Sequence, residues 1–210
     1  MANGIQLIRA SESRTTKWSG GTTTELAIFP EGSQYLRRDF GWRLSTATVE
    51  AEHTVFTKLP GIWRILMVTE GHLKLKHQGQ HEVSLGPFDQ DAFDGGWTTE
   101  SWGQARDLNL MTLEAYESTM KGIAWGTKNP GYRELLLPVK TPGTVRWELL
   151  YGISGDLTIQ MGSGWRDRLN RGDLLLVSRE GITAPTELVA TSEAASATGA
   201  AVRVSIIERG

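Results

Sequence analysis

The sequence has no cysteine, only four histidines and no long hydrophobic run among its 210 residues. The lack of cysteine excludes disulfides, thiolate nucleophiles, iron–sulfur clusters and zinc sites that use sulfur. Apolar runs such as Ile65–Val68 and Leu174–Val177 reach only four residues, far fewer than a membrane span needs. The first residues lack the basic and apolar regions of a signal peptide. We therefore expect a cytoplasmic protein with no membrane partner.

An excess of charge of one sign is lacking too. The chain carries 22 basic and 24 acidic residues, for a formal net charge of −2. Binding to a nucleic-acid backbone needs a surplus of positive charge, so we expect no nucleic-acid partner. The length allows one large domain or two small ones, each able to bury a core.

Glycine, by contrast, is abundant, and it separates short segments rich in β-branched and aromatic residues. Several segments alternate between apolar and polar residues, as Leu73–Lys76 does, which is typical of a strand with one buried face. No window of 12 or more residues carries an apolar stripe with helical spacing. The sequence therefore predicts an all-β protein, with strands over Leu44–Val49, Trp63–Thr69, Leu73–Lys76, Asn109–Leu113, Val145–Tyr151, Leu157–Met161, Leu174–Ser178 and Val202–Ile207.

An internal repeat indicates how these strands are organised. At a constant offset of 84 residues, apolar residues and glycines of the first half align with the same types in the second half. The aligned pairs are Leu66 and Leu150, Gly71 and Gly155, Leu73 and Leu157, Leu75 and Ile159, Leu85 and Leu169, and Phe93 and Val177. We expect two copies of one β unit, over residues 1–118 and 119–210, joined within Lys121–Thr144.

The second copy resembles cupins. Its Gly155-Asp156 and Gly172-Asp173 turns, each followed by a strand, are similar to the Gly-Asp signature of the cupin barrel. The resemblance implies a bicupin, with two jelly-roll β-barrels in one chain.

The first half resembles a narrower family, HutD/Ves. Five blocks carry this resemblance in order, namely Trp18–Leu26, Asp39–Ala47, Phe56–Arg64, Phe93–Gly95 and Arg106–Met111. It implies a bicupin of bacterial histidine utilisation that binds a small acidic metabolite such as formylglutamate. The implied role is metabolic or regulatory, with no established enzymatic activity. Ser19 and Thr22 stand where the family commonly has Asn and another Gly, which favours a Ves-like or HutD-related protein over an operon member.

Cupin metal sites usually combine two histidines one residue apart, a glutamate shortly after them and a histidine on a distant strand. Here no two of His53, His72, His77 and His81 have that spacing. The segment His77–Glu82 is typical of a solvated hairpin tip. We therefore expect no metal site and no cofactor. The alternative is a metal-dependent oxygenase, isomerase or hydrolase that uses His72, His77, His81 and Glu82.

Other catalytic patterns are absent as well. The sequence has no cysteine nucleophile, no G-x-S-x-G elbow and no phosphate-binding glycine loop followed by a helix. We predict no catalytic residues and expect a binding protein rather than an enzyme.

Arginines within apolar strands are the strongest functional signal. Alternation places Arg43 and Ser45 on one face of their strand, and Arg64 on the same face as Leu66 and Val68. A buried arginine needs a partner, which is either a protein carboxylate or a ligand. The protein alternative pairs Arg43 with Glu25, or Arg64 with Asp107. The ligand alternative is a site for a small carboxylate, made of Arg43, Ser45, Phe56, Arg64, Phe93, Asn109 and Met111.

Two further alternatives concern partners. The eight tryptophans could stack on a sugar, although their dispersal along the chain favours packing in the core. Exposed strand edges could pair with a second copy to form a homodimer.

Overall fold

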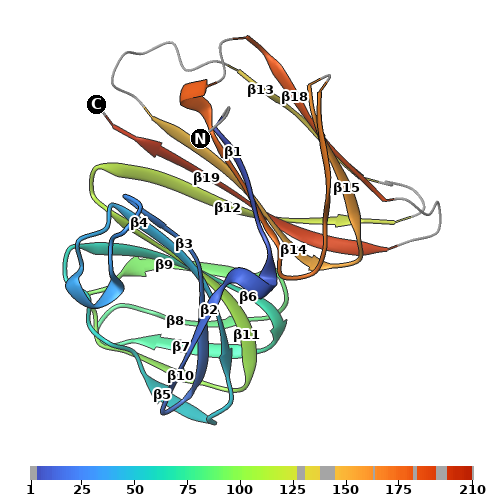
Figure 1. The fold of residues 1–210 in the computed structure, drawn as a ribbon. Coiled ribbons are helices and arrows are strands. Elements are labelled where there is room, and N and C mark those ends of the chain that lie inside the picture. The colour runs from blue at the N-terminus through green and yellow to red at the C-terminus, as the bar shows by residue number, and fades with distance from the viewer. Residues whose placement is uncertain are drawn as a thin grey trace. The chain divides into compact units, whose positions relative to one another are not determined.

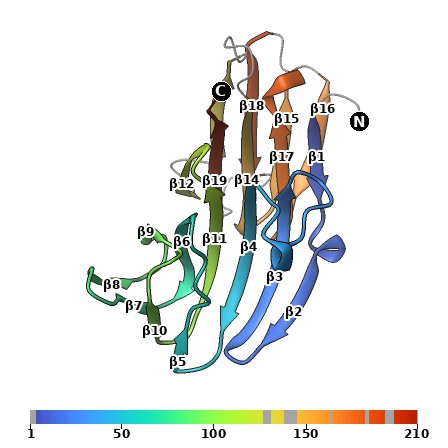
Figure 2. The ribbon, with the colours of Figure 1, turned by 90° about the vertical axis from the view of Figure 1, so that its left-hand side faces the viewer.

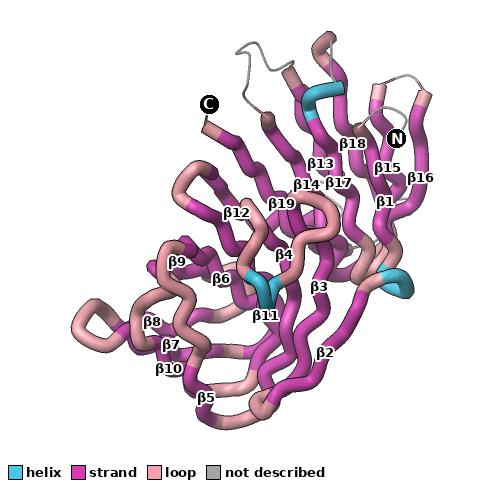
Figure 3. The backbone as a smooth tube through the Cα atoms, turned by 60° about the vertical axis from the view of Figure 1, so that its left-hand side comes forward, coloured by secondary structure: helices cyan, strands magenta, loops and turns pink. Residues whose placement is uncertain are grey.

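The computed structural model describes residues 4–126, 131–137, 145–162, 164–181, 184–192 and 198–209. Strands dominate these residues, and their helices are the short 3-10 helices η1 (Ala10–Glu12), η2 (Tyr35–Arg37) and η3 (Arg179–Gly181) (Figure 3). The described part of the chain contains no α-helix, which confirms the all-β prediction. None of its helices has the length and apolar character that crossing a membrane requires.

All eight strands predicted from the sequence are present in the structure. The alternation that predicted them also gives the correct faces. In Leu73–His77 the two leucines are buried and the two lysines are exposed, so the polar side chains stay in water while the leucines enter the core.

The chain forms two compact units. The first unit is Ser13–Tyr116, and the second combines Met1–Glu12 with Glu117–Gly210. The expected boundary at residues 118 and 119 therefore lies two residues from the observed one, but the first twelve residues join the second unit. The reason is strand pairing, because β1 (Ile5–Ile8) forms an antiparallel pair with β17 (Leu174–Ser178).

The first unit contains a six-stranded sheet and a four-stranded sheet (Figures 1 and 2). The six-stranded sheet has the order β2 (Arg14–Trp18), β3 (Gly21–Phe29), β4 (Trp42–Val49), β11 (Ala105–Leu113), β6 (Ile62–Gly71) and β9 (Gln90–Asp94). The four-stranded sheet has the order β5 (His53–Val55), β10 (Thr99–Trp102), β7 (Leu73–His77) and β8 (Glu82–Leu85).

The second unit contains a five-stranded sheet and another four-stranded sheet. The five-stranded sheet has the order β1, β17, β14 (Arg146–Ser154), β19 (Gly199–Glu208) and β12 (Tyr116–Trp125). The four-stranded sheet has the order β13 (Gly131–Leu136), β18 (Thr186–Ser192), β15 (Leu157–Met161) and β16 (Trp165–Leu169). The predicted join at Lys121–Thr144 is thus partly strand, and its residues 127–130 and 138–144 lie outside the described residues.

The 84-residue repeat appears as a repeated strand pattern. The order β9-β6-β11-β4 in the first unit corresponds to β17-β14-β19-β12 in the second, and β5-β10-β7-β8 corresponds to β13-β18-β15-β16. The registers correspond too. Leu73 lies opposite Leu85, and Leu157, 84 residues later, lies opposite Leu169. The two units are therefore copies of one strand arrangement.

Candidate functional site

A cavity of about 340 Å³ lies within the first unit. Six of the seven residues predicted to bind a carboxylate line it, namely Arg43, Ser45, Phe56, Arg64, Asn109 and Met111. The seventh, Phe93, is fully buried behind them, in contact with both Phe56 and Arg64. The structure thus brings together side chains from five separate segments of the sequence.

The register of the six-stranded sheet explains this convergence. Met111 of β11 lies opposite Arg43 of β4 on one side and opposite Arg64 of β6 on the other. Side chains at directly paired positions point to the same face of a sheet. The two arginines are therefore two strands apart, roughly 10 Å between their Cα atoms, and face the same cavity.

Arg43 is held by protein groups. Its Nε donates a hydrogen bond of 2.7 Å to Glu25 Oε2, and its Nη1 donates one of 3.0 Å to Ser45 Oγ. Its guanidinium carbon also lies 4.5 Å from the centre of the Tyr35 ring, a cation–π contact. Of the two alternatives for Arg43, the ion pair with Glu25 is present, and it fixes the orientation of this arginine at the cavity wall.

Arg64 has a different environment. The residue is only 6% exposed, and its guanidinium carbon lies 4.8 Å from the Phe56 ring centre and 5.0 Å from that of Phe93. Its Nε has no hydrogen-bond partner, and the described residues place no carboxylate within ion-pair distance of it. Burial lowers its pKa to about 10, although nearby Asp107 opposes the shift. Arg64 is therefore charged at neutral pH, and the salt bridge with Asp107 that was the alternative to a ligand is not formed.

Asp107 and Asn109 supply the remaining buried polar atoms. The side-chain Oδ1 of each has no hydrogen-bond partner among the described residues. Burial raises the pKa of Asp107 to about 7, despite the attraction of Arg64 and a hydrogen bond to the backbone of Ala47. The carboxyl is therefore largely neutral below pH 7, so the positive charge of Arg64 is not cancelled there.

Several residues at the cavity were not in the predicted set. Thr16, Trp18, Ser19 and Thr23 line it from β2, β3 and the turn between them, and Tyr35 reaches it from η2. Thr23 lies two residues before Glu25 in β3, so alternation places both side chains on the same face of the strand. Because Glu25 was a candidate partner of Arg43, this alternation could have identified Thr23 from the sequence. Nothing in the sequence pattern indicates Tyr35, because it lies outside any strand.

The tryptophans divide between core and surface. Trp42, Trp125 and Trp147 are buried, and Trp97 and Trp165 pack against buried clusters. The expectation that most of them pack in the core is confirmed. Trp18, Trp63 and Trp102 are exposed, and of these Trp18 lines the cavity.

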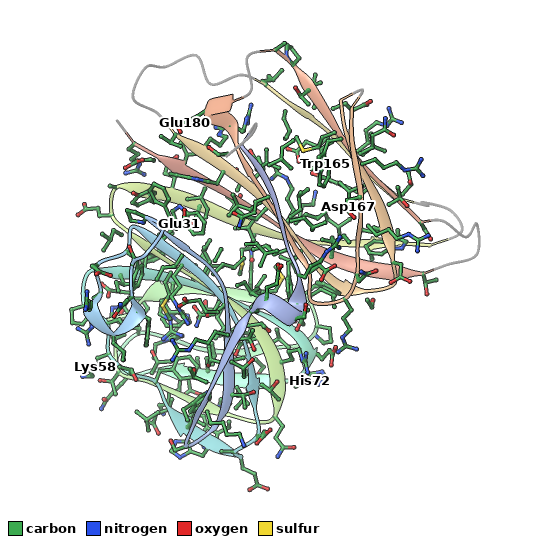
Figure 4. All side chains as sticks on the ribbon, in the orientation of Figure 1. Glu31, Lys58, His72, Trp165, Asp167 and Glu180 are labelled. Carbon is green, nitrogen blue, oxygen red and sulfur yellow. The ribbon has the colours of Figure 1, made fainter. Side chains whose placement is uncertain are left out.

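The structure does not assemble the ligand set considered for a metal-dependent enzyme. Glu82 forms ion pairs of 2.8 Å with Lys74 and 2.9 Å with Lys76. His72 precedes β7 (Figure 4), whereas His77 ends it, which separates them by roughly 16 Å. That distance is too long for two ligands of one ion.

A family model named HutD matches residues 10–196, most of the chain. The chain belongs to the HutD family. A curated protein from Pseudomonas putida, described as an uncharacterized 21.2 kDa protein in the hutC 3' region, is 34% identical over 111 residues. That alignment covers 51% of this chain and 57% of the relative, so it spans little more than half of the relative's length.

Solved structures agree with the HutD assignment. HutD from Pseudomonas fluorescens superposes with a TM-score of 0.72 at 23% identity, covering 98% of this chain and 100% of that one. A conserved protein from Pseudomonas aeruginosa superposes with a TM-score of 0.79 at 22% identity, covering 96% of this chain and 98% of that one. Oxalate decarboxylase from Bacillus subtilis superposes with a TM-score of 0.60 at 11% identity, covering 97% of this chain and 77% of that one. At these identities the similarity shows the fold alone, and this fold is cupin-like.

Proposed function

We propose that this HutD-family protein binds a small carboxylate, of the size and charge of formylglutamate, in the cavity of the first unit. Arg64 carries the proposal. A buried, charged guanidinium with an unpartnered Nε is unfavourable in a protein interior unless an anion joins it. A carboxylate can accept two parallel hydrogen bonds from such a group.

The other groups around the cavity fit a ligand with two polar ends. Arg43 stands on the far side of Met111 from Arg64, which suits a dicarboxylate that spans the two strands. Ser45 and Asn109 add hydrogen-bonding atoms, and Phe56 with Met111 supplies an apolar wall. A volume of about 340 Å³ is at the lower end of small-molecule sites, which favours a ligand with few atoms.

We further propose that the two units are two cupin barrels of a bicupin. The matching strand order and register support this proposal. The proposed role is metabolic or regulatory within histidine utilisation, without catalysis. The Pseudomonas putida relative, which is encoded beside hutC, supports the pathway.

Calorimetry and thermal denaturation with N-formylglutamate, glutamate and glutarate test the proposal. A ligand present at 100 times its Kd should stabilise the wild type by about 2.7 kcal/mol. Glutaramide has the length of glutarate without its charges, and we expect no stabilisation from it. Absence of stabilisation by any of the three acids at millimolar concentration contradicts the proposal.

Two variants locate the site. Arg64→Ala should abolish the stabilisation by acids. Arg106→Ala is the matched control, because Arg106 lies on the same strand as Asn109 but alternation directs it away from the cavity. An equal response of both variants would place the binding elsewhere. Proton NMR of N-formylglutamate incubated with the protein tests the absence of catalysis, since formate release indicates an enzyme.

A further inference from the structure

A second cluster of polar side chains lies at the end of the β7–β8 hairpin. His77 closes β7, His81 follows the turn, and Asp91 comes from β9 in the other sheet of the first unit. His77 Nε2 lies 2.8 Å from Asp91 Oδ2, and His81 Nε2 lies 3.0 Å from the same oxygen. The three potential ligand atoms all lie within 4.8 Å of one another.

The backbone of the hairpin sets this geometry. The N–H of His77 donates a 2.9 Å hydrogen bond to the carbonyl of His81, and Gln80 N–H donates one of 2.9 Å to the carbonyl of His77. Gly79 adopts a φ of +76° in the turn between them. The two imidazoles are thus placed side by side, with ring centres 4.6 Å apart, by a tight turn that does not depend on the side chains themselves.

A hydrogen bond at the other ring nitrogen fixes the orientation of the His77 side chain. Its Nδ1 lies 2.8 Å from the hydroxyl oxygen of Thr99. When Nδ1–H donates to that hydroxyl, Nε2 keeps its lone pair and points at Asp91 and His81. A histidine that ligates a metal is oriented in this way by a hydrogen bond at its other nitrogen. Phe93 and Trp97 pack against the ring, at 4.4 Å and 5.6 Å between centres, and form an apolar wall.

We propose that His77, His81 and Asp91 form a binding site for a divalent transition-metal ion, such as Zn²⁺, with two nitrogen ligands and one carboxylate oxygen. A tetrahedral ion with bonds of ~2.0–2.1 Å holds its ligand atoms about 3.3 Å apart. The observed separations of 2.8 and 3.0 Å need only a small opening to reach that value. Imidazole and carboxylate are the ligands that Zn²⁺, Fe²⁺, Co²⁺ and Ni²⁺ share.

The site has an entry path and room for further ligands. His81 has a side-chain exposure of 41%, whereas Asp91 is partly buried and His77 is buried. A site with three protein ligands leaves at least one position for water or another ligand, which is the arrangement of open zinc sites. This site is distinct from the carboxylate cavity, because none of its three ligands lines that cavity.

Titration of the full chain, without an affinity tag, with Co²⁺ and Zn²⁺ tests the proposal. Visible absorption of bound Co²⁺ reports its coordination, and competition with a chromogenic chelator gives the affinity for Zn²⁺. We expect one ion per chain for the wild type. His81→Ala and Asp91→Asn should each weaken binding about 100-fold or more, and Thr99→Val, which removes the outer hydrogen bond, by about 10–100-fold.

His72→Ala is the matched control, since His72 is an exposed histidine of the same unit at the opposite end of β7. It should bind the ion like the wild type. His81 and Asp91 are changed instead of His77 because the loss of a buried ring could unfold the unit, and circular dichroism checks that each variant is folded. A wild type without stoichiometric binding overturns the proposal. Binding that His81→Ala and Asp91→Asn retain, or that His72→Ala loses, overturns it as well.

Discussion

Arg64 and Glu148 occupy the same position in the two copies of the strand arrangement. Arg64 lies opposite Phe93 on the neighbouring strand, and Glu148 lies opposite Val177, each 84 residues further along the chain. Both are buried, but their partners differ. Glu148 accepts hydrogen bonds from Arg179 at 3.2 Å and Arg203 at 2.9 Å, whereas Arg64 has no such ion pair among the described residues. The charge in the second unit is satisfied internally, whereas the charge in the first has no such partner, which agrees with the carboxylate site proposed for it.

Loss of Glu148 should therefore destabilise the protein strongly. Glu148→Ala leaves the buried Arg179 without its carboxylate, and breaking a buried ion pair in this way costs ~3–5 kcal/mol. Glu187→Ala, which removes the exposed ion pair with Arg133, should cost no more than ~1 kcal/mol. Urea denaturation of both variants measures the difference. Similar losses of unfolding free energy contradict the assigned roles of the two pairs.

Arg64→Met should have the opposite effect on stability. The ligand-free protein carries the desolvation cost of a buried guanidinium, and methionine of similar length fills the space without that charge. We expect the free energy of unfolding to stay equal or to rise by about 1 kcal/mol, while binding of glutarate is lost. Denaturation and calorimetry on the same preparation provide both readings. A variant that is destabilised by several kcal/mol would show that Arg64 has a structural role.

Much of this arrangement could be predicted from the sequence, for a physical reason. A strand has a side-chain period of two, so a short alternating segment determines which face Arg43, Arg64 and Asn109 occupy. The 84-residue repeat revealed the second copy in the same way, through spacing within the chain. Both signals are local or periodic, and the structure contains the strands and faces that they predicted.

Pairing between distant segments could not be predicted in this way. The approach of Asp91 to His77 depends on β9 pairing with β6, and the pairing of β1 with β17 joins opposite ends of the sequence. Neither pairing leaves a periodic signal. The sequence left open whether Arg64 pairs with Asp107 or with a ligand, and the structure shows that these two side chains do not form an ion pair.

Binding of a carboxylate should weaken as the pH rises through 7. Asp107 is largely neutral below its pKa of about 7, and above it a negative charge near Arg64 competes with the ligand. We expect the Kd of glutarate, which is mostly a dianion at both pH values, to be about tenfold higher at pH 8 than at pH 6. Calorimetry at the two pH values measures this ratio.

Asp107→Asn is the control for that pH dependence. The variant should bind glutarate with nearly the same Kd at pH 6 and pH 8. Stability gives a second check, because a carboxyl with a raised pKa holds its proton more tightly in the folded state. The unfolding free energy of the wild type should fall between about pH 4 and pH 7, and Asp107→Asn should lack that contribution. If the Kd of glutarate and the unfolding free energy of Asp107→Asn depend on pH as in the wild type, a group other than Asp107 is responsible for the titration.

Gly71 is the turn residue that the repeat matches with Gly155, and it should tolerate no side chain. Its φ is +78°, and a Cβ there would lie 2.4 Å from the carbonyl oxygen of Gln104. Gly79 has a similar φ of +76°, but nothing lies within 4 Å of the position of its Cβ. Gly79→Ala should therefore cost only the ~1–2 kcal/mol of a left-handed backbone, whereas Gly71→Ala adds a clash with main-chain atoms that cannot rotate away. Urea denaturation should give a clearly larger loss of unfolding free energy for Gly71→Ala, and equal losses would mean that backbone conformation alone selects glycine at this turn.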